Sequence, residues 1–308
     1  MTPARPLHRQ ALQRHELEHR AESAAARLPG LLAAAHRIAA NVNLGAHGRR
    51  QPGLGESFWQ FRPYGPDDSP QAIDWRQSAK SDELYIKERE WAASQTVALW
   101  CDLSPSMHFR STRDLPTKAE RAGVLLLALG ILLIEGGERI LRLSATGAPV
   151  PAAMTGRLAL MQIAEQMTRD FDAARPEDLP LFNVKLPRYG ATVLIGDFLQ
   201  PIEAVAKTFE AFRERHHGVH LVQVLDPAEE TLPYNGRVRF EGLENEGALV
   251  IDRTEDARGA YVTKLAAHRD ALKALSASYA WSFTTHRTDA APHLTLVALH
   301  RVIGERPR

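Results

Sequence analysis

The sequence predicts an α/β fold built on a doubly wound, mostly parallel sheet. Three short apolar runs, 96–101, 191–198 and 219–225, have the β-prone composition of strands buried on both faces. Helical patterns separate these runs, and this alternation is typical of parallel sheets with helices on both sides. The 308 residues are enough for one large domain with appendages or for two domains.

Composition excludes several classes of protein. Apolar residues make up 44% and charged residues 24% of the chain, which is ordinary for a soluble globular protein. The net charge of +1 favours neither nucleic acid nor a membrane surface as a partner. Cys101 is the only cysteine, so no disulfide forms within the chain, and we interpret it as a small buried hydrophobe. With no signal peptide either, the sequence predicts a cytoplasmic protein.

The first part of the chain, 1–95, is expected to be a helical and irregular/β extension. Apolar residues recur at helical spacing over 24–42 and predict an amphipathic helix that docks on its own chain or on a partner. An aromatic and acidic segment follows at 58–75, and 84–90 alternates like a strand. Ion pairs that fix this irregular segment are favoured over a catalytic carboxylate pair as the role of its acidic residues, which are Asp67, Asp68 and Asp74.

The second part, 96–308, holds the expected sheet. Its longest apolar run, 122–134, is shorter than the roughly 20 residues that span a bilayer, so a buried helix and no membrane span are predicted. The expected strands are 96–101, 139–144, 191–198, 219–225 and 280–284, with a β-hairpin over 236–251. The expected helices are 117–135, 158–167, 202–215, 261–275 and 293–303.

A candidate metal site follows the first of these strands. Asp102, Ser104 and Ser106 alternate in a tight loop and can direct three oxygen atoms to one point. Asp197 ends a second strand, and parallel strands end at the same edge of a sheet, where ligands bind in open α/β folds. Hard cations such as Mg²⁺ prefer these oxygen donors. The alternative is an Asp/Ser turn whose side chains bond to the local backbone.

Several motifs carry a resemblance to a known family. The loop Asp102-x-Ser104-x-Ser106 looks like the metal-ion-dependent adhesion site of von Willebrand factor type A domains. The wider pattern, from about Gly45 to the end of the chain, resembles the bacterial proteins called domain of unknown function 58. The residues that carry this wider resemblance are Arg62, Tyr64, Asp67, Asp68, Ile73 to Trp75, Ala79, Lys80, Lys87 to Glu90, Gly136 to Arg139, Leu194 to Phe198, Asp226 to Glu229, Leu232 and Pro233.

The resemblance implies a von Willebrand factor type A-like domain over 96–308, with a hairpin insertion near 236–251 and a family-specific extension over 1–95. It implies that Asp102, Ser104, Ser106 and Asp197 hold Mg²⁺, which keeps one coordination position open for a partner's carboxylate. It also implies a non-enzymatic protein-binding module that acts with a MoxR-type AAA+ ATPase in chaperone-like maturation of a client protein. The chain has no phosphate-binding loop of the Gly-x-x-x-x-Gly-Lys-Ser/Thr kind, so such a partner would supply the ATP-driven work.

The chain departs from the type A pattern at one ligand. Type A domains usually add a threonine from a loop between the two aspartate-bearing strands, and no threonine lies between Thr168 and Thr192. The candidate substitutes are Glu177 and Asp178, with Thr155 as a further candidate that precedes a predicted helix.

Two other functions stay open at this point. One is a metal-dependent hydrolase or phosphatase with Asp102 as nucleophile, although such phosphatases carry Asp-x-Asp and this chain has Ser104 at the second position. A serine nucleophile would need a histidine and an orienting acid, and His108 and His286 are available for this role although nothing in the sequence positions them for it. The other is a metal-free scaffold that makes its contacts through the N-terminal helix and the hairpin.

Overall fold

The computed structural model describes residues 29–42, 58–65, 70, 73–80, 83–89, 95–143, 153–173, 179, 190–213, 218–243 and 247–304. They belong to two compact units. One unit contains Met1–Leu44 together with Gln95–Arg308, and the other contains Gly45–Ser94.

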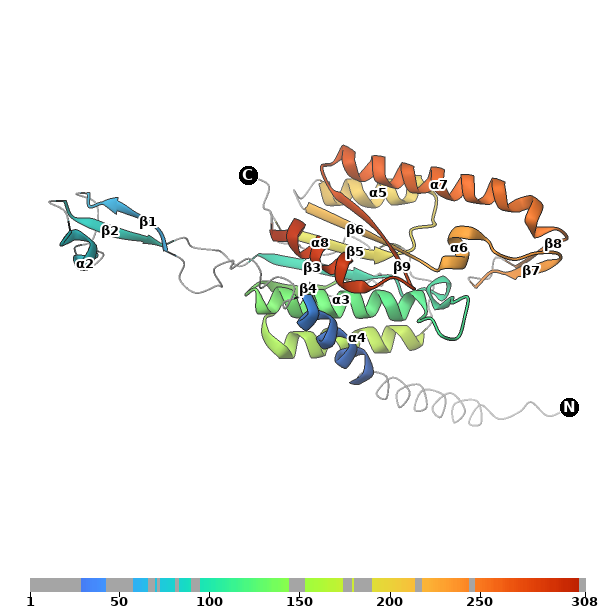
Figure 1. Ribbon diagram of the computed structural model, residues 1–308, viewed down its shortest axis with the longest axis horizontal. Coiled ribbons are helices and arrows are strands. Elements are labelled where there is room, and N and C mark those ends of the chain that lie inside the picture. Colours follow the sequence, from blue (N-terminus) through green and yellow to red (C-terminus); the bar gives the residue numbers. More distant parts are fainter. Residues whose placement is uncertain are drawn as a thin grey trace, which may run out of the picture. The chain divides into compact units, whose positions relative to one another are not determined.

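A five-stranded parallel sheet forms the centre of the first unit (Figure 1). Its strand order is β4-β3-β5-β6-β9, and all four neighbouring pairs are parallel. The strands are β3 (Thr96–Cys101), β4 (Arg139–Arg142), β5 (Ala191–Gly196), β6 (Gly218–Leu225) and β9 (Ser282–Arg287). The predicted α/β class with a mostly parallel sheet is therefore confirmed.

The order of the strands reverses between β3 and β5. From β3 the chain passes to β4 on one side, and it then returns to place β5 on the other side of β3. Cys101 pairs with Ile195, and the Asp102 amide donates to the Ile195 carbonyl at 2.8 Å. In open α/β sheets this reversal opens a crevice at the carboxyl ends of the strands. Asp102 and Asp197 leave the sheet at this reversal.

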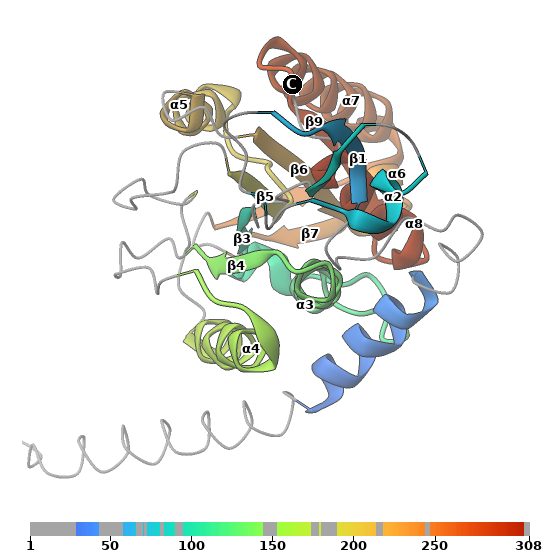
Figure 2. The ribbon, with the colours of Figure 1, turned by 90° about the vertical axis from the view of Figure 1, so that its left-hand side faces the viewer.

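Helices cover both faces of the sheet, as the end-on view in Figure 2 shows. α3 (Lys118–Glu135) and α4 (Gly156–Ala173) cover one face, and α5 (Ile202–Arg213) and α7 (Thr254–Ser278) cover the other. α8 (Pro292–Gly304) packs on the α3 side, where its Leu296 and Leu299 join the core. Aromatic side chains fill the opposite face, where Phe209 and Phe212 of α5 are fully buried.

α3 is the central helix of its face, and it forms where the sequence predicts it. Thr117 begins the helix with a capping box, in which its hydroxyl accepts from the Glu120 amide and the Glu120 carboxylate accepts from the Thr117 amide. Its middle is apolar on all sides and buried, as expected for a helix between a sheet and a second helix layer. Gly136 closes the helix at its carboxyl end.

The N-terminal helix belongs to the same unit. Residues 29–42 are helical, and the buried Ala35, Ala39 and Val42 join the core that α3 forms with the sheet. Docking on its own chain, one of the two options left by the sequence, is what the structure has. The expected division at residue 95 grouped this helix with the extension, whereas its apolar face places it with the sheet.

The second unit is a small antiparallel pair with one short helix. β1 (Phe58–Pro63) pairs with β2 (Tyr85–Arg89), close to the strand predicted over 84–90. α2 (Trp75–Ser78) begins at Asp74, whose carboxylate accepts from the Gln77 amide at 3.0 Å. Asp74 therefore has a structural role as a helix cap that bonds to a backbone amide, and the ion pairs expected for this segment stay a prediction. Asp67 and Asp68 lie outside the described residues.

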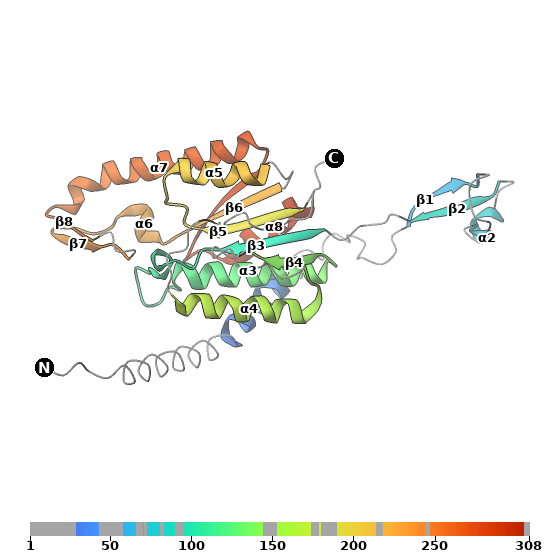
Figure 3. The same cartoon turned by 180° about the vertical axis from the view of Figure 1, so that it is seen from behind.

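The remaining elements follow β6 around the carboxyl edge of the sheet (Figure 3). α6 (Pro227–Thr231) was not predicted, because five residues are too few to show a helical period. The predicted hairpin is present as β7 (Val238–Glu241) and β8 (Ala248–Ile251), and α7 extends well beyond the predicted 261–275. Within the described residues, none of the helices has the length and apolar character needed to cross a membrane.

Candidate functional site at the carboxyl edge of the sheet

The loop after β3 folds back on itself through its own polar groups. Asp102 is 1% exposed, and its Oδ1 accepts from the Ser104 amide at 2.8 Å. The hydroxyls of Ser104 and Ser106 share a hydrogen bond of 2.9 Å. The loop then enters η2 (Pro105–His108), a single turn of 3-10 helix. Local bonding of the kind expected for an Asp/Ser turn is therefore present.

Asp197 joins this loop from the neighbouring strand. The Ser106 hydroxyl donates to Asp197 Oδ2 at 3.3 Å. A Cβ on the preceding residue, Gly196, would lie 3.1 Å from the Cβ of Asp102, so only glycine lets the two loops approach this closely. The structure thus brings Asp102, Ser104, Ser106 and Asp197 together. Their role as metal ligands stays a prediction.

A buried lysine enters the same cluster. Lys118 is the first residue of α3, and its side chain is 1% exposed. Its Nζ lies 2.9 Å from Asp197 Oδ2 and 2.7 Å from Glu229 Oε1. Sequence reasoning missed both Lys118 and Glu229. One signal was available, because a cation in the first turn of a helix opposes the helix dipole and needs a compensating anion.

Glu229 is held in place by the cap of α6. Asp226 begins that helix, and the Glu229 Oε2 accepts from the Asp226 amide at 2.8 Å, which leaves Oε1 for Lys118. The Oδ2 of Asp226 also accepts from the amide of Ser111, at 3.0 Å, in the loop after β3. The loops after β3, β5 and β6 are therefore joined into one polar cluster.

The charges of this cluster balance one another locally. Burial lowers the pKa of Lys118, but Asp197 and Glu229 together outweigh it, so that the pKa lies above its ordinary value. Burial raises the pKa of the Glu229 carboxyl, and Lys118 opposes that rise. Lys118 is consequently an ammonium ion at neutral pH, with a carboxylate on either side.

The cluster, as the structure has it, does not fit a divalent cation. Its donors are hard oxygens of the right kind. However, the Oδ2 of Asp197 is bonded to an ammonium ion, and the Oδ1 of Asp102 is turned to a backbone amide. Across the ranges that the structure describes, no group of three or more His, Cys, Asp or Glu side chains is arranged to hold a metal ion.

The candidate substitutes for the type A threonine do not complete the set. Thr155 is exposed and stands just before α4. Glu177 and Asp178 lie outside the described residues.

Three histidines make their hydrogen bonds away from the serine loop. His220 bonds to Ser282 on the neighbouring strand β9, and His286 bonds to Thr295 of α8. His268 of α7 donates to the carbonyl of Phe198, the residue after Asp197, whose φ of 49° is in the left-handed region. His268 thereby supports the backbone turn that directs Asp197, which is a structural role.

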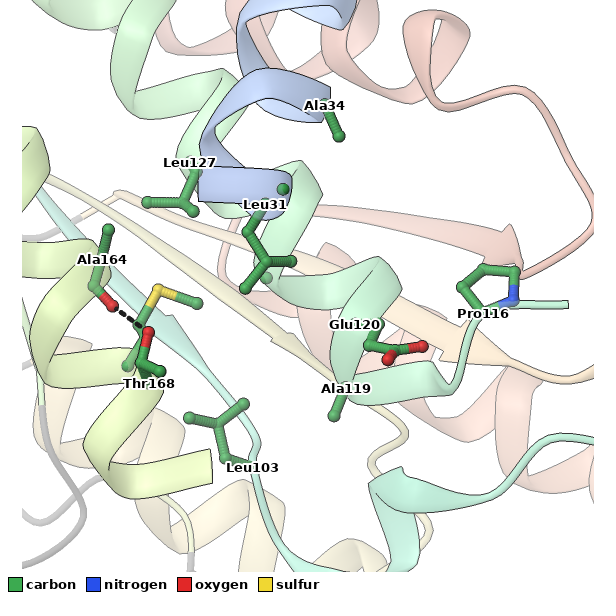
Figure 4. Close-up of a pocket in the computed structure, with 12 residues that line it drawn as sticks. Leu31, Ala34, Leu103, Pro116, Ala119, Glu120, Leu127, Ala164 and Thr168 are labelled. Carbon is green, nitrogen blue, oxygen red and sulfur yellow. Dashed lines mark hydrogen bonds between the residues drawn. The ribbon is translucent and has the colours of Figure 1, made fainter. Parts of the chain in front are cut away.

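Two hollows lie in the described part of the sheet unit, and one of them borders the cluster. One, of about 410 Å³, lies between the loop after β3, α6, the β7–β8 hairpin and α7. Its walls carry Glu229 and four aromatic side chains, which are Phe109, Tyr234, Phe240 and Tyr261. The other, of about 300 Å³, lies between the helix of residues 29–42 and helices α3 and α4, with Leu103 at one end (Figure 4). Its aliphatic lining sets the second hollow apart from the polar site.

Fold and site together define an α/β protein with a carboxylate, hydroxyl and ammonium cluster where the strand order of a parallel sheet reverses. Residues 60–271 match the family described as protein of unknown function DUF58. The chain belongs to that family.

Several further proteins are similar to this chain. The chain is 27% identical over 243 residues to uncharacterized proteins of Mycobacterium bovis (Mb1516) and Mycobacterium tuberculosis (Rv1480), covering 71% of this chain and 70% of each relative. Two crystal structures are similar at 14% identity and cover 69% of this chain and 100% of their own. They are the conserved hypothetical protein BatB of Bacteroides thetaiotaomicron, with a TM-score of 0.34, and an aerotolerance-related membrane protein of Bacteroides fragilis, with a TM-score of 0.37.

Proposed function

We propose that this chain is a non-enzymatic protein-binding module of von Willebrand factor type A-like architecture. It docks partner proteins at the carboxyl edge of its sheet, and it acts with a MoxR-type AAA+ ATPase in the maturation of a client protein. The observation that carries the proposal is the cluster itself, because its reactive groups are bonded to one another in a way that suits a rigid binding surface.

The bonding within the cluster argues against a hydrolase. A nucleophile needs an activating base or a lowered pKa. The Asp102 carboxylate accepts from its own loop, the two serine hydroxyls bond to each other, and Asp197 is bonded to Lys118. His220, His268 and His286 bond to groups outside the serine loop, so none of these three supplies the base of a serine nucleophile.

Exposed side chains around the cluster supply the means of recognition. Arg110 and Arg113 are exposed on the loop after β3, and Leu199 is 43% exposed on the loop after β5. Two guanidinium groups are complementary to an acidic partner segment, and an exposed apolar side chain can contact the apolar residues of such a segment. The hollow beside Glu229 can take up a partner side chain on the same edge.

Binding in the absence of metal tests the proposal. The purified chain is titrated with the MoxR-type ATPase of the same organism in buffer with EDTA, and the affinity is measured by calorimetry. The double variant R110E/R113E is expected to bind at least about tenfold more weakly, because two attractive contacts become repulsive. The control R169E reverses an exposed charge on α4 and is expected to bind like the unmodified chain. Equal affinity of R110E/R113E and R169E contradicts the proposal.

A Mg²⁺-dependent form of docking is the second candidate. The convergence of Asp102, Ser104, Ser106 and Asp197 favours it, since these residues match the type A adhesion site. It requires Asp197 to be available to the ion, and the same titration with MgCl₂ in place of EDTA separates the two forms. A large gain of affinity with MgCl₂ favours the second candidate over the first.

A phosphatase assay separates binding from hydrolysis. With a generic aryl phosphate and MgCl₂, we expect no turnover above that of the D102N variant. Turnover by the unmodified chain that D102N abolishes contradicts the non-enzymatic proposal.

A further inference from the structure

We propose that the ammonium group of Lys118 is the resident cation of this cluster and keeps divalent cations out of it. The inference deepens the proposed function, because it makes docking independent of metal. Only this consequence for docking rests on the proposed function. Its own test needs no partner protein, so the result of the docking experiment does not decide it.

The first step is the position of the ammonium group. Nζ lies between the carboxylates of Asp197 and Glu229, at 2.9 and 2.7 Å, and the Asp197 oxygen that it contacts also accepts from Ser106. Asp197 follows β5, Glu229 follows β6 by way of α6, and Lys118 begins α3. One cation thus links loops that leave three neighbouring strands, which is the work that a bound ion does between oxygen ligands.

The second step is that the local environment in α3 disfavours a charged lysine at the position of Lys118. A lysine at the first position of a helix meets the positive end of the helix dipole, and a side chain that is 1% exposed loses nearly all its hydration. Glu120, the acidic residue in the first turn of α3, is bonded to the Thr117 amide, and the ammonium group bonds to Asp197 and Glu229 instead. The two carboxylates from other loops offset both costs, so the site as a whole selects a cation at this point.

The third step is competition for the same oxygen. A divalent cation bound by Asp197 through Oδ2 would be next to the ammonium ion, and like charges repel strongly in a buried site. The charge of Lys118 belongs to a side chain of the protein, so it does not dissociate from the site as a bound metal ion can. The cluster of Asp102, Asp197 and Glu229 therefore admits a divalent cation only when Lys118 is removed.

A purely structural ion pair would share the geometry and differ in one outcome. Replacing Lys118 would then lower stability with no new property. If Lys118 is the resident cation, its replacement by a neutral residue leaves carboxylates and hydroxyls with no cation between them. The variant then gains affinity for divalent cations.

The experiment is a calorimetric titration of the full chain with MnCl₂. We compare the unmodified chain with K118M and with K118M/E229Q, which removes one carboxylate together with the lysine and limits unpaired buried charge. K118R keeps a positive charge at the same position, and K207M makes the same change at an exposed site on α5.

The ratio of association constants decides the outcome. We expect K118M or K118M/E229Q to bind Mn²⁺ at least about tenfold more tightly than the unmodified chain, while K118R and K207M show no gain. A ratio of one or less for both lysine-to-methionine variants overturns the inference.

Thermal unfolding of the unmodified chain decides the matter if neither variant folds. If the cluster binds no metal, the chain has the same unfolding temperature in EDTA and in millimolar MnCl₂. Only an ion that binds the folded state raises the unfolding temperature. A saturable rise of several degrees with MnCl₂ would overturn the inference, and its absence supports it.

Discussion

Gly196 sets the approach of the two aspartates in the candidate site. A Cβ at this position would lie 3.1 Å from the Cβ of Asp102 and 3.4 Å from the buried ring of Trp100. We expect G196A to lower the free energy of unfolding by about 1–3 kcal/mol, since the neighbouring groups must move to make room. Urea denaturation measures this change.

Gly259 provides the matched control for that prediction. It lies within α7, is exposed, and has nothing within 4 Å of where its Cβ would be. G259A is therefore expected to raise the free energy of unfolding by roughly 0.5–1 kcal/mol, through the higher helix propensity of alanine. The prediction for the site fails if both glycines respond alike.

His220 makes the folded chain sensitive to mild acid. Burial lowers its pKa to about 4, so the folded chain keeps it neutral while the unfolded chain protonates it near pH 6.5. Stability is present above the unfolded pKa and is lost as the pH falls toward the folded one. Between pH 7.5 and 5.5 this loss amounts to about 1.3 kcal/mol for one such group.

The H220Q variant tests this effect. Its free energy of unfolding is expected to fall less steeply between pH 7.5 and 5.5 than that of the unmodified chain, by about the amount given for one histidine. H293Q, at an exposed position of α8, serves as the control and should keep the original slope. An unchanged slope in H220Q would show that the buried imidazole does not account for the acid sensitivity.

The sequence could predict one half of the candidate site and not the other. Asp102, Ser104, Ser106 and Asp197 follow strands whose apolar composition is plain, and parallel pairing brings strand ends together. Lys118 and Glu229 come from the starts of two helices, and their contact depends on the exact directions of those helices. Contacts between side chains of three different loops leave no periodic pattern in the sequence.

At the scale of elements, buried helices and strands were predictable because they obey simple periods. β3 and α3 have the predicted bounds or differ by one residue. α6 was missed, and the ends of α4 and α7 were underestimated, because exposed helical turns lack the apolar spacing on which the prediction depends. For α6, the capping residue Asp226 marks the start of the helix, which hydrophobicity does not.

The helix of residues 29–42 offers a test of packing at this scale. Ala39 is 1% exposed and lies in the core with α3, whereas its neighbour Ala40 is exposed. We expect A39D to lower the free energy of unfolding by about 2–4 kcal/mol, because it buries an unpaired carboxylate. A40D should change it by no more than about 0.5 kcal/mol. Equal effects of A39D and A40D in chemical denaturation would refute the docking of this helix on the sheet unit.

At the scale of the whole molecule, the sheet could be predicted from the sequence, whereas the division of the chain into its two units could not. The alternation of strands and helices over 96–308 is enough to predict a doubly wound sheet. The chain order alone suggested one boundary near residue 95, yet the amphipathic helix before the small unit folds with the sheet after it. Such discontinuous units depend on long-range burial, which a pass along the sequence does not detect.

The cluster at the switch point is the feature on which the account of this molecule depends. Lys118, Asp197 and Glu229 join the loops of β3, β5 and β6, and they do so with charges that balance internally. In the proposed function, an edge built in this way is ordered before a partner arrives, and such preorganisation lowers the entropic cost of docking.

A crystal structure of the chain grown with MnCl₂, with anomalous diffraction data, is the sharpest test of whether Lys118 is the cation of this cluster. We expect density for the Lys118 ammonium between Asp197 and Glu229, and no anomalous peak beside Ser104, Ser106 or either aspartate. An anomalous peak in contact with Ser104, Ser106 and Asp197, with Lys118 turned away from Asp197, would contradict it.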